Sequence, residues 1–238
     1  MGGNSLNVNL DLEDEHCLVV GGGRVAERKV KILHDADADL TVVSPEFSDS
    51  LSDFLEDERI KYLEENFRED HLKNSFLVIA ATSDKEVNKK VSRSAREENI
   101  PVNVVDDKEL SDFTLTANFN RGNLMIAVST AGASPALSAS IKERLKDEFG
   151  LVYSIYLDIL ERMRPEIIER YPEGERRRIL LELGDGEVEN ALDEGDLEKA
   201  LNLAGEALPE DIERTYIDVL DEVGVDIDGE FDYRNQDE

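Results

Sequence analysis

Three consecutive glycines interrupt an apolar run in LVVGGGRVA, residues 18–26. Gly21, Gly23 and Ala26 fit the spacing G-x-G-x-x-[G/A] that joins a strand to a helix in dinucleotide-binding folds. In that geometry the first glycine makes a tight turn, and the second lets the main chain approach a pyrophosphate. The helix that follows supplies N–H donors to the phosphates. A plain strand-to-helix turn is the alternative interpretation, and the surrounding strand pattern favours the nucleotide site.

Residues after the predicted strands complete the candidate cofactor site, because ligands of open α/β sheets lie outside the carboxyl ends of the strands. An acidic residue usually ends the second strand of an NAD site, but here Ser44 stands there and can hydrogen-bond a ribose hydroxyl. No basic residue between Thr41 and Arg59 is available for the 2′-phosphate of NADP, so we expect NAD as cofactor. The expected contacts are Gly21, Gly22, Gly23, Arg24, Val25, Ser44, Pro45, Ala81 and Thr82. A solvated surface position remains open for Arg24, and Ser83 or Asp84 is expected to cap the helix after Thr82.

Four apolar runs predict the sheet that positions these residues, at 17–20, 40–43, 76–81 and 102–105. They are apolar nearly throughout, as strands covered on both faces of a parallel sheet are. Residues 60–63 predict a weaker, peripheral strand. Helical spacing of apolar residues between the runs predicts amphipathic helices near 26–33, 47–55 and 87–95. This alternation is typical of a Rossmann-like domain.

The pattern changes after residue 110. Two β-prone runs within 112–129 meet across residues 120–123, which predicts a hairpin, and Ser134 and Pro135 are suited to begin a helix. From about residue 150 only helical spacings recur. The sequence therefore predicts an α/β fold: an NAD-binding Rossmann-like parallel-sheet domain over 1–110, a small α+β hairpin-plus-helix segment over 111–149, and an acidic helical domain over 150–238.

The chain is strongly acidic, with 56 Asp and Glu against 27 Lys and Arg and a formal net charge of −29. Such a charge repels nucleic acid and anionic membrane surfaces, so neither is expected as a partner. It fits a cytoplasm of high salt, where self-repulsion is screened. The sequence has no apolar run of membrane-spanning length, and its start lacks the pattern of a signal peptide, so a cytoplasmic location is expected.

The chain has one cysteine and three histidines. Cys17 cannot form an internal disulfide or a multi-cysteine metal site, and its position in an apolar run predicts a buried side chain. The histidines precede a strand, end a helix or lie in a charged stretch, so no metal-ligating residues are predicted.

With GGGRVAERK, AATSD, VNVVD and AVSTAGASPALSASIKERL in this order, residues 10–150 resemble the dehydrogenase and chelatase module of siroheme synthase. AVSTAGASPAL is the more specific of these tracts. The resemblance implies NAD-dependent oxidation of precorrin-2 to sirohydrochlorin, followed in some members by insertion of ferrous iron. It also implies a homodimer in which the hairpin region and the helical tail exchange contacts.

In this family the aspartate of VNVVD is assigned to both reactions, and here it is Asp106. The residues support this independently, because Asp106 ends a predicted strand and so faces the cofactor crevice. A carboxylate there can accept the proton that leaves with the hydride. A turn or capping role is the alternative for Asp106, and Asp107 is its nearest rival.

Precorrin-2 carries many carboxylates, which an acidic protein must bind through local cations and N–H donors. Arg121 in the hairpin and the main chain at the start of the next helix are candidates. The expected substrate contacts are Asn103, Arg121, Ser129, Thr130, Gly132 and Ser134. The alternatives are a solvated turn residue for Arg121 and purely local turn contacts for Ser129 and Thr130.

A second class of function stays open, namely a regulatory module that binds NAD and reports redox state through its helical tail. Such a regulator needs neither Asp106 nor the AVSTAGASPAL tract, which favours the enzyme.

Overall fold

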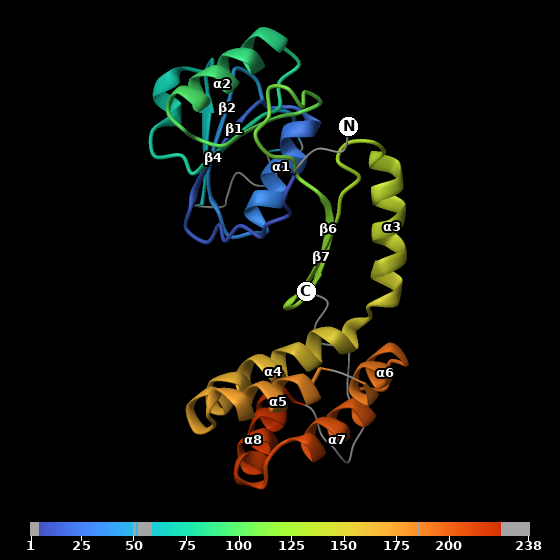
Figure 1. Cartoon of the computed structure of the whole chain (residues 1–238). Coiled ribbons are helices and arrows are strands. Elements are labelled where there is room, and N and C mark those ends of the chain that lie inside the picture. The colour runs from blue at the N-terminus through green and yellow to red at the C-terminus, as the bar shows by residue number, and fades with distance from the viewer. Residues whose placement is uncertain (1–4, 50, 52–58, 185, 225–238) are drawn as a thin grey trace. The chain divides into compact units, whose positions relative to one another are not determined.

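The computed structural model describes residues 5–49, 51, 59–184 and 186–224. Residue contacts divide the chain into two units, which we name the sheet unit, Asn4–Leu115, and the helical unit, Thr116–Glu238 with Met1–Gly3. Each is described by itself, and Figure 1 labels their elements. The predicted boundaries after residues 110 and 149 stay predictions.

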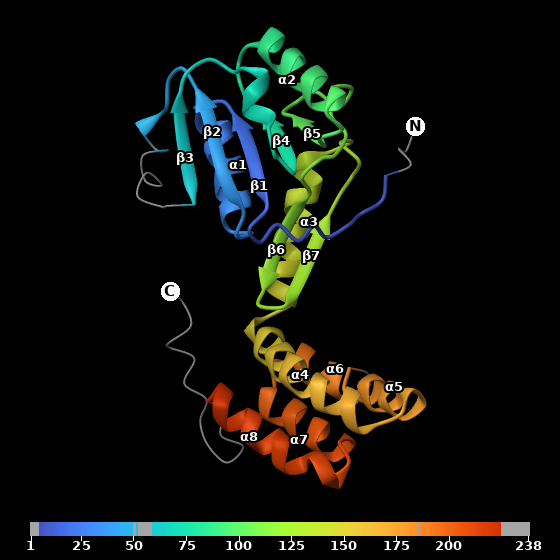
Figure 2. The ribbon, with the colours of Figure 1, turned by 90° about the vertical axis from the view of Figure 1, so that its left-hand side faces the viewer.

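The sheet unit holds one parallel sheet of five strands: β1 (His16–Val20), β2 (Asp39–Ser44), β3 (Ile60–Glu64), β4 (Leu77–Ala80) and β5 (Val102–Val104). Their order is β3-β2-β1-β4-β5, visible in Figure 2, and every neighbouring pair is parallel. Strands β2 and β3 lie on one side of β1, whereas β4 and β5 lie on its other side, so the strand order reverses next to β1, as in Rossmann-like folds. The predicted Rossmann-like sheet is confirmed, with residues 60–64 as an edge strand.

Alternate residues of each central strand pack into two separate cores, one on each face of the sheet. Helix α1 (Arg24–His34) covers one face with Ala26, Val30 and Leu33, against Cys17 and Val19 of β1. Helix α2 (Lys85–Glu97) covers the other face with Val91 and Ala95, against Leu18 and Val20 among others. A short 3-10 helix, η2 (Glu69–Leu72), adds Leu72 to that second core. The helix predicted near 47–55 falls mostly outside the described residues.

Cys17 is fully buried in the first core, as predicted. Burial raises the pKa of its thiol to about 12, so it stays protonated in the folded protein.

The chain after β5 covers the outer edge of that strand. Asp112 N–H donates to Val102 O at 2.8 Å, and Val104 N–H donates to Ser111 Oγ at 2.9 Å. Arg96 of α2 bonds the Asp112 carboxylate at 3.0 Å and fixes this segment to the helix. The sheet is therefore closed at its β5 edge.

The helical unit begins with the predicted hairpin, β6 (Ala117–Arg121) and β7 (Leu124–Val128), which pair antiparallel around Gly122 and Asn123. Helix α3 (Pro135–Glu148) lies against one face of this hairpin (Figure 2). The hairpin turn packs on α4 (Leu151–Arg170), where Asn123 Nδ2 donates to Glu161 Oε2 at 2.6 Å. Gly122 has φ +52°, and a Cβ there would lie 2.5 Å from Ser154 Oγ, so this contact requires glycine.

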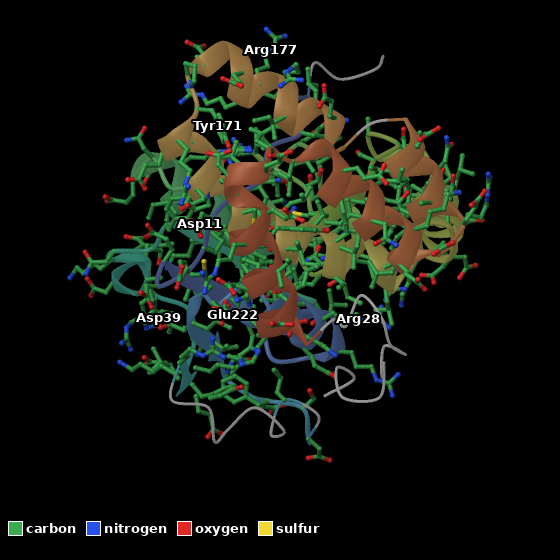
Figure 3. All side chains as sticks on the ribbon, turned by 90° about the horizontal axis from the view of Figure 1, so that it is seen from below. Asp11, Arg28, Asp39, Tyr171, Arg177 and Glu222 are labelled. Atoms are coloured by element: carbon green, nitrogen blue, oxygen red, sulfur yellow. The ribbon has the colours of Figure 1, made fainter. Side chains whose placement is uncertain are left out.

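Helices α4, α5 (Glu173–Glu182), α6 (Glu187–Asp193), α7 (Leu197–Ala207) and α8 (Glu213–Val223), with the 3-10 turn η3 (Glu210–Ile212), enclose a separate apolar core. Ile159, Met163 and Ile167 of α4 lie at its centre and are fully buried. Charged side chains such as Arg177 project from the outside of these helices (Figure 3). The predicted helical C-terminal region is confirmed. No helix in the described ranges is long and apolar enough to span a membrane.

Candidate functional site

Gly21 and Gly22 are glycines because the protein itself leaves no room for a side chain. Gly21 has φ +135°, and a Cβ on it would lie 2.5 Å from Ala81 O, at the end of β4. A Cβ on Gly22 would meet the Glu46 carbonyl oxygen and would lie 2.6 Å from Ser44 Oγ. These two glycines therefore bring the ends of β1, β2 and β4 together.

Gly23 differs from both, because a Cβ there would meet no protein atom within 4 Å. Its φ of −95° suits any residue, so neither packing nor main-chain strain explains this glycine. Gly23 is the N-cap of α1, and no side chain of the described residues caps that helix. Arg24 and Val25 in the first turn are exposed. Bare main chain, free space and uncapped N–H groups are what a diphosphate requires, so these residues fit a dinucleotide.

The turn after β2 is tied to the glycine loop. Ser44 is buried and its hydroxyl donates to Glu46 O at 2.6 Å, while Pro45 between them is exposed. Ser48 N–H donates to Gly22 O at 2.8 Å. The Ser44 proton is used in the turn and its oxygen accepts from Glu46 N–H at 3.4 Å, so one lone pair is left for a ribose hydroxyl.

The loop after β4 is held by Asn88, a buried residue of α2 that the sequence reasoning missed. Asn88 Nδ2 donates to Thr82 O at 3.0 Å, and its Oδ1 accepts from Thr82 N–H at 3.3 Å and lies 2.8 Å from Thr82 Oγ1. Asp84 caps α2 by accepting from Glu86 and Val87 N–H, as predicted. The spacing of Asn88, three residues before Val91 in the predicted helix, places it on the buried face and could have indicated its role.

The two aspartates after β5 have different surroundings. Asp107 Oδ1 accepts from Glu109 N–H at 3.1 Å and Leu110 N–H at 3.2 Å, so its carboxylate holds the turn. Asp106 is exposed at φ +62°, and its carboxylate accepts no hydrogen bond within the described part of the chain. Asp and Asn are the non-glycine residues that adopt this left-handed region most readily, so the turn is compatible with an aspartate.

Lys29 of α1 lies within electrostatic reach of Asp106, and this too was missed. Burial lowers the pKa of the Lys29 ammonium, the negative charge of Asp106 opposes that shift, and the neighbouring Arg28 (Figure 3) adds to it. The sheet unit thus combines a glycine loop, a ribose-side acceptor and an uncommitted carboxylate beside a half-buried cation. A hydride acceptor bound at the loop and a proton acceptor at Asp106 are the two components of a dehydrogenation site.

Asn103, predicted to contact substrate, is buried in β5. Its Nδ2 donates to Phe113 O at 2.9 Å, which fixes the chain after the strand. At least one of its two donor hydrogens therefore serves the fold.

The remaining predicted substrate residues lie in the helical unit, where they form two groups. Thr130 Oγ1 accepts from Ser134 N–H at 3.0 Å, Ser129 Oγ accepts from Ala131 N–H at 3.1 Å, and Ser134 caps α3. Gly132, at φ +84°, lies in the same turn.

Arg121 is at the other end of α3, where it bonds Phe149 O at 3.4 Å and Lys146 O at 3.5 Å. A helix of 14 residues, about 21 Å long, separates the ends of α3. One chain therefore does not bring Arg121 to the turn that holds Ser129, Thr130, Gly132 and Ser134.

Comparisons with known proteins agree with these features. Residues 8–117 match a family described as NAD(P)-binding, and residues 121–148 match the central region of sirohaem biosynthesis proteins. The first match confirms the prediction of a nicotinamide dinucleotide cofactor.

Two similar proteins are named siroheme synthase. The one from Methylobacillus flagellatus is 40% identical over 178 residues, 75% of this chain and 38% of that protein. The one from Psychromonas ingrahamii is 39% identical over 206 residues, 84% of this chain and 43% of that protein. This chain thus spans about two fifths of the length of these relatives.

A solved structure, that of "SirC, precorrin-2 dehydrogenase", matches with a TM-score of 0.66 and 28% identity, over 85% of this chain and all of that one. The resemblance inferred from the sequence is confirmed. Over the greater part of its length, this chain is therefore a homologue of siroheme synthases, and it shares the fold of a precorrin-2 dehydrogenase.

Proposed function

We propose that this protein oxidises precorrin-2 to sirohydrochlorin with NAD as the hydride acceptor. The observation that carries the proposal is the free carboxylate of Asp106 in the same sheet unit as a glycine loop whose Gly23 faces open space. The solved structure whose whole length this chain matches is named precorrin-2 dehydrogenase, which supports this choice of reaction.

In the proposed reaction, bound NAD would supply the hydride acceptor for one hydrogen of the substrate. Main-chain N–H groups at Gly23 and Arg24 would hold its diphosphate, and Ser44 Oγ would accept a hydrogen bond from its adenosine ribose. Asp106 takes the hydrogen that leaves as a proton, because its carboxylate is exposed and free of turn hydrogen bonds. Lys29 places a positive charge within electrostatic reach of this carboxylate.

The substrate is proposed to be a tetrapyrrole held by its carboxylates. In the helical unit Arg121 and the N–H groups near Gly132 and Ser134 are the proposed anion contacts. A homodimer acting in the cytoplasm is part of the same proposal.

Ferrous iron is a second proposed substrate, inserted into the sirohydrochlorin that the first reaction makes. Asp106 would then accept the protons that leave the pyrrole nitrogens as the metal binds. This step is separable from the first, because it requires no NAD.

An assay with precorrin-2 tests both steps. We expect purified protein with NAD to form NADH and the sirohydrochlorin spectrum at equal rates, with NADP a poorer cofactor. No NADH above the protein-free rate would refute the dehydrogenase. A parallel assay of sirohydrochlorin with ferrous or cobaltous ion, in the absence of air, should exceed the spontaneous metallation rate if the second step occurs.

The alternative, a redox-sensing module without catalysis, gains no support from the relatives, which are named as synthases or a dehydrogenase. In the same assay it would appear as NAD binding without turnover.

A further inference from the structure

Helix α1 of the sheet unit carries a row of cations that have no acidic partner. Arg24, Arg28 and Lys31 are exposed, and Lys29 is half-buried beside them. Among the residues that the structure describes, none forms an ion pair or a hydrogen bond with the side chains of these four. The chain has 56 acidic and 27 basic residues, so a shortage of carboxylates does not explain their absence here.

Helix α2, on the opposite face of the same sheet, provides an internal comparison. Four of its five cations pair with carboxylates, at distances between 2.8 and 4.0 Å. The pairs are Lys89 with Glu86, Lys90 with Glu69, Arg93 with Glu97 and Arg96 with Asp112. Two helices of similar charge thus cover one sheet, and α1 is the one whose cations stay available to a ligand.

The surroundings of Lys29 favour a bound anion. Burial lowers the pKa of its ammonium, the negative charge of Asp106 opposes this shift, and the positive charge of Arg28 adds to it. Two like charges next to each other, one of them partly withdrawn from water, are unfavourable in the absence of an anion. A carboxylate that contacts both would remove this repulsion through charge-assisted hydrogen bonds.

Apolar side chains accompany these two cations along one side of α1. Val25 is 43% and Ile32 is 39% exposed. Val25, Arg28, Lys29 and Ile32 occupy positions i, i+3, i+4 and i+7, which form one continuous stripe on a helix. We name these four residues the α1 stripe. It rises about 10 Å along the helix axis and combines exposed apolar surface with unpaired positive charge.

The α1 stripe adjoins both parts of the candidate site. Val25 follows Gly23 by two residues, in the first turn of α1, and Lys29 is within electrostatic reach of Asp106. The chain that follows Asp106 contributes Phe113, which packs on the same core as α1. Hydride and proton transfer require the substrate to lie against both the cofactor and the proton acceptor, and the α1 stripe borders both.

We propose that the α1 stripe binds the substrate, with Arg28 and Lys29 as contacts of its carboxylates and Ile32 as a contact of its ring system. The ligand class is an extended apolar ring that carries several carboxylates. This inference rests on the proposed function, and it adds substrate contacts in the sheet unit to those proposed in the helical unit.

Variants that remove one charge each test the cationic contacts. Arg28→Gln and Lys29→Gln should each raise KM for precorrin-2 about tenfold, and Arg28→Gln should leave kcat within about twofold, because a carboxylate contact persists from the bound substrate to the transition state. Lys31→Gln removes the same charge from the same helix outside the α1 stripe, so its KM should stay within about twofold. Initial rates of NADH formation over a range of precorrin-2 concentrations measure these constants.

Binding of the product gives a readout that does not depend on turnover. Sirohydrochlorin, titrated into protein without NAD and followed by its absorbance, should bind about tenfold more weakly to Arg28→Gln and Lys29→Gln than to Lys31→Gln. Ile32→Asn should weaken product binding about threefold. The melting temperatures of Arg28→Gln and Ile32→Asn should match wild type, since both side chains are exposed. The NAD affinity of Arg28→Gln should stay within about twofold of wild type.

The outcomes separate this inference from the proposed function. An active wild type, with Arg28→Gln and Lys29→Gln indistinguishable from Lys31→Gln in KM and product affinity, would overturn the inference alone. A loss of NAD affinity in Arg28→Gln as large as its loss of product affinity would assign the cation to the cofactor and would also overturn it. A wild type that neither oxidises precorrin-2 nor binds sirohydrochlorin would overturn the proposed function and this inference together.

Discussion

Two glycines, two residues apart, have different reasons to be glycine. Gly21 has φ +135° and touches the end of β4, whereas Gly23 has an unstrained φ and faces open space. The same substitution should therefore damage the fold at one position and the ligand site at the other.

We expect Gly21→Ala to lower the free energy of unfolding by roughly 1–3 kcal/mol, because it adds both strain and a clash with Ala81 O. Gly23→Ala should leave stability within about 0.5 kcal/mol and weaken NAD binding about tenfold, since its methyl group occupies the space meant for the phosphates. Urea unfolding and an NAD titration measure the two effects. Equal loss of stability in both variants would contradict this division.

The aspartates at 106 and 107 allow a similar test. Asp106→Asn keeps a residue type that tolerates φ +62° but cannot accept a proton, so turnover should fall about 100-fold or more while NAD binding persists. Asp107→Asn is the matched control: it weakens a turn that holds two N–H groups, costing about 1 kcal/mol, and should keep most activity. The rate of NADH formation decides, and the reverse ranking would make Asp107 the working carboxylate.

Among the elements, helix α2 holds a loop of the candidate site, a role that its sequence pattern does not predict. It packs on the sheet through Val91 and Ala95, and the same helix anchors the loop after β4 through Asn88. Its Ser92, one turn later, holds a different loop by donating to Leu110 O at 2.7 Å.

Asn88→Ala should lower the free energy of unfolding by roughly 1–3 kcal/mol and also weaken NAD binding, because Thr82 loses its support at the cofactor crevice. Ser92→Ala should cost about 1 kcal/mol without changing NAD affinity, since Leu110 lies outside the loop after β4. Calorimetric titration with NAD compares the two variants. An unchanged NAD affinity in Asn88→Ala would remove Asn88 from the site.

The elements that positioned the site were predictable because their signals are local. A buried parallel strand is apolar throughout, and the glycine spacing follows directly on one such strand, so β1, α1 and the loop between them could be read from residues 16–34. Asn88 and Lys29 could not, because their roles depend on which strand end lies opposite them in the folded sheet. The separation of Arg121 from Ser129 follows from the length of α3, but only once α3 is known to lie along the hairpin.

At the scale of the whole molecule, charge dominates. A net charge of −29 destabilises the folded protein through repulsion between its own charges. Dissolved ions screen this repulsion beyond the Debye length, which falls from about 10 Å at 0.1 M salt to about 3 Å at 1 M.

The midpoint of thermal unfolding should therefore rise by roughly 5 °C between 0.1 M and 1 M potassium chloride. Differential scanning calorimetry measures it, and sucrose, which leaves charges unscreened, serves as the reference additive. A midpoint that is flat or falls with salt would contradict an acidic surface suited to high salt.

The tyrosines give the helical unit its own optical signal. The chain has no tryptophan and six tyrosines, four of which, Tyr153, Tyr156, Tyr171 and Tyr216, anchor helices of this unit through their hydroxyl groups. The sheet unit has Tyr62 alone among its described residues. Near-ultraviolet dichroism will therefore follow the melting of the helices, whereas loss of bound cofactor will report on the sheet, so the two halves can be watched separately in one unlabelled sample.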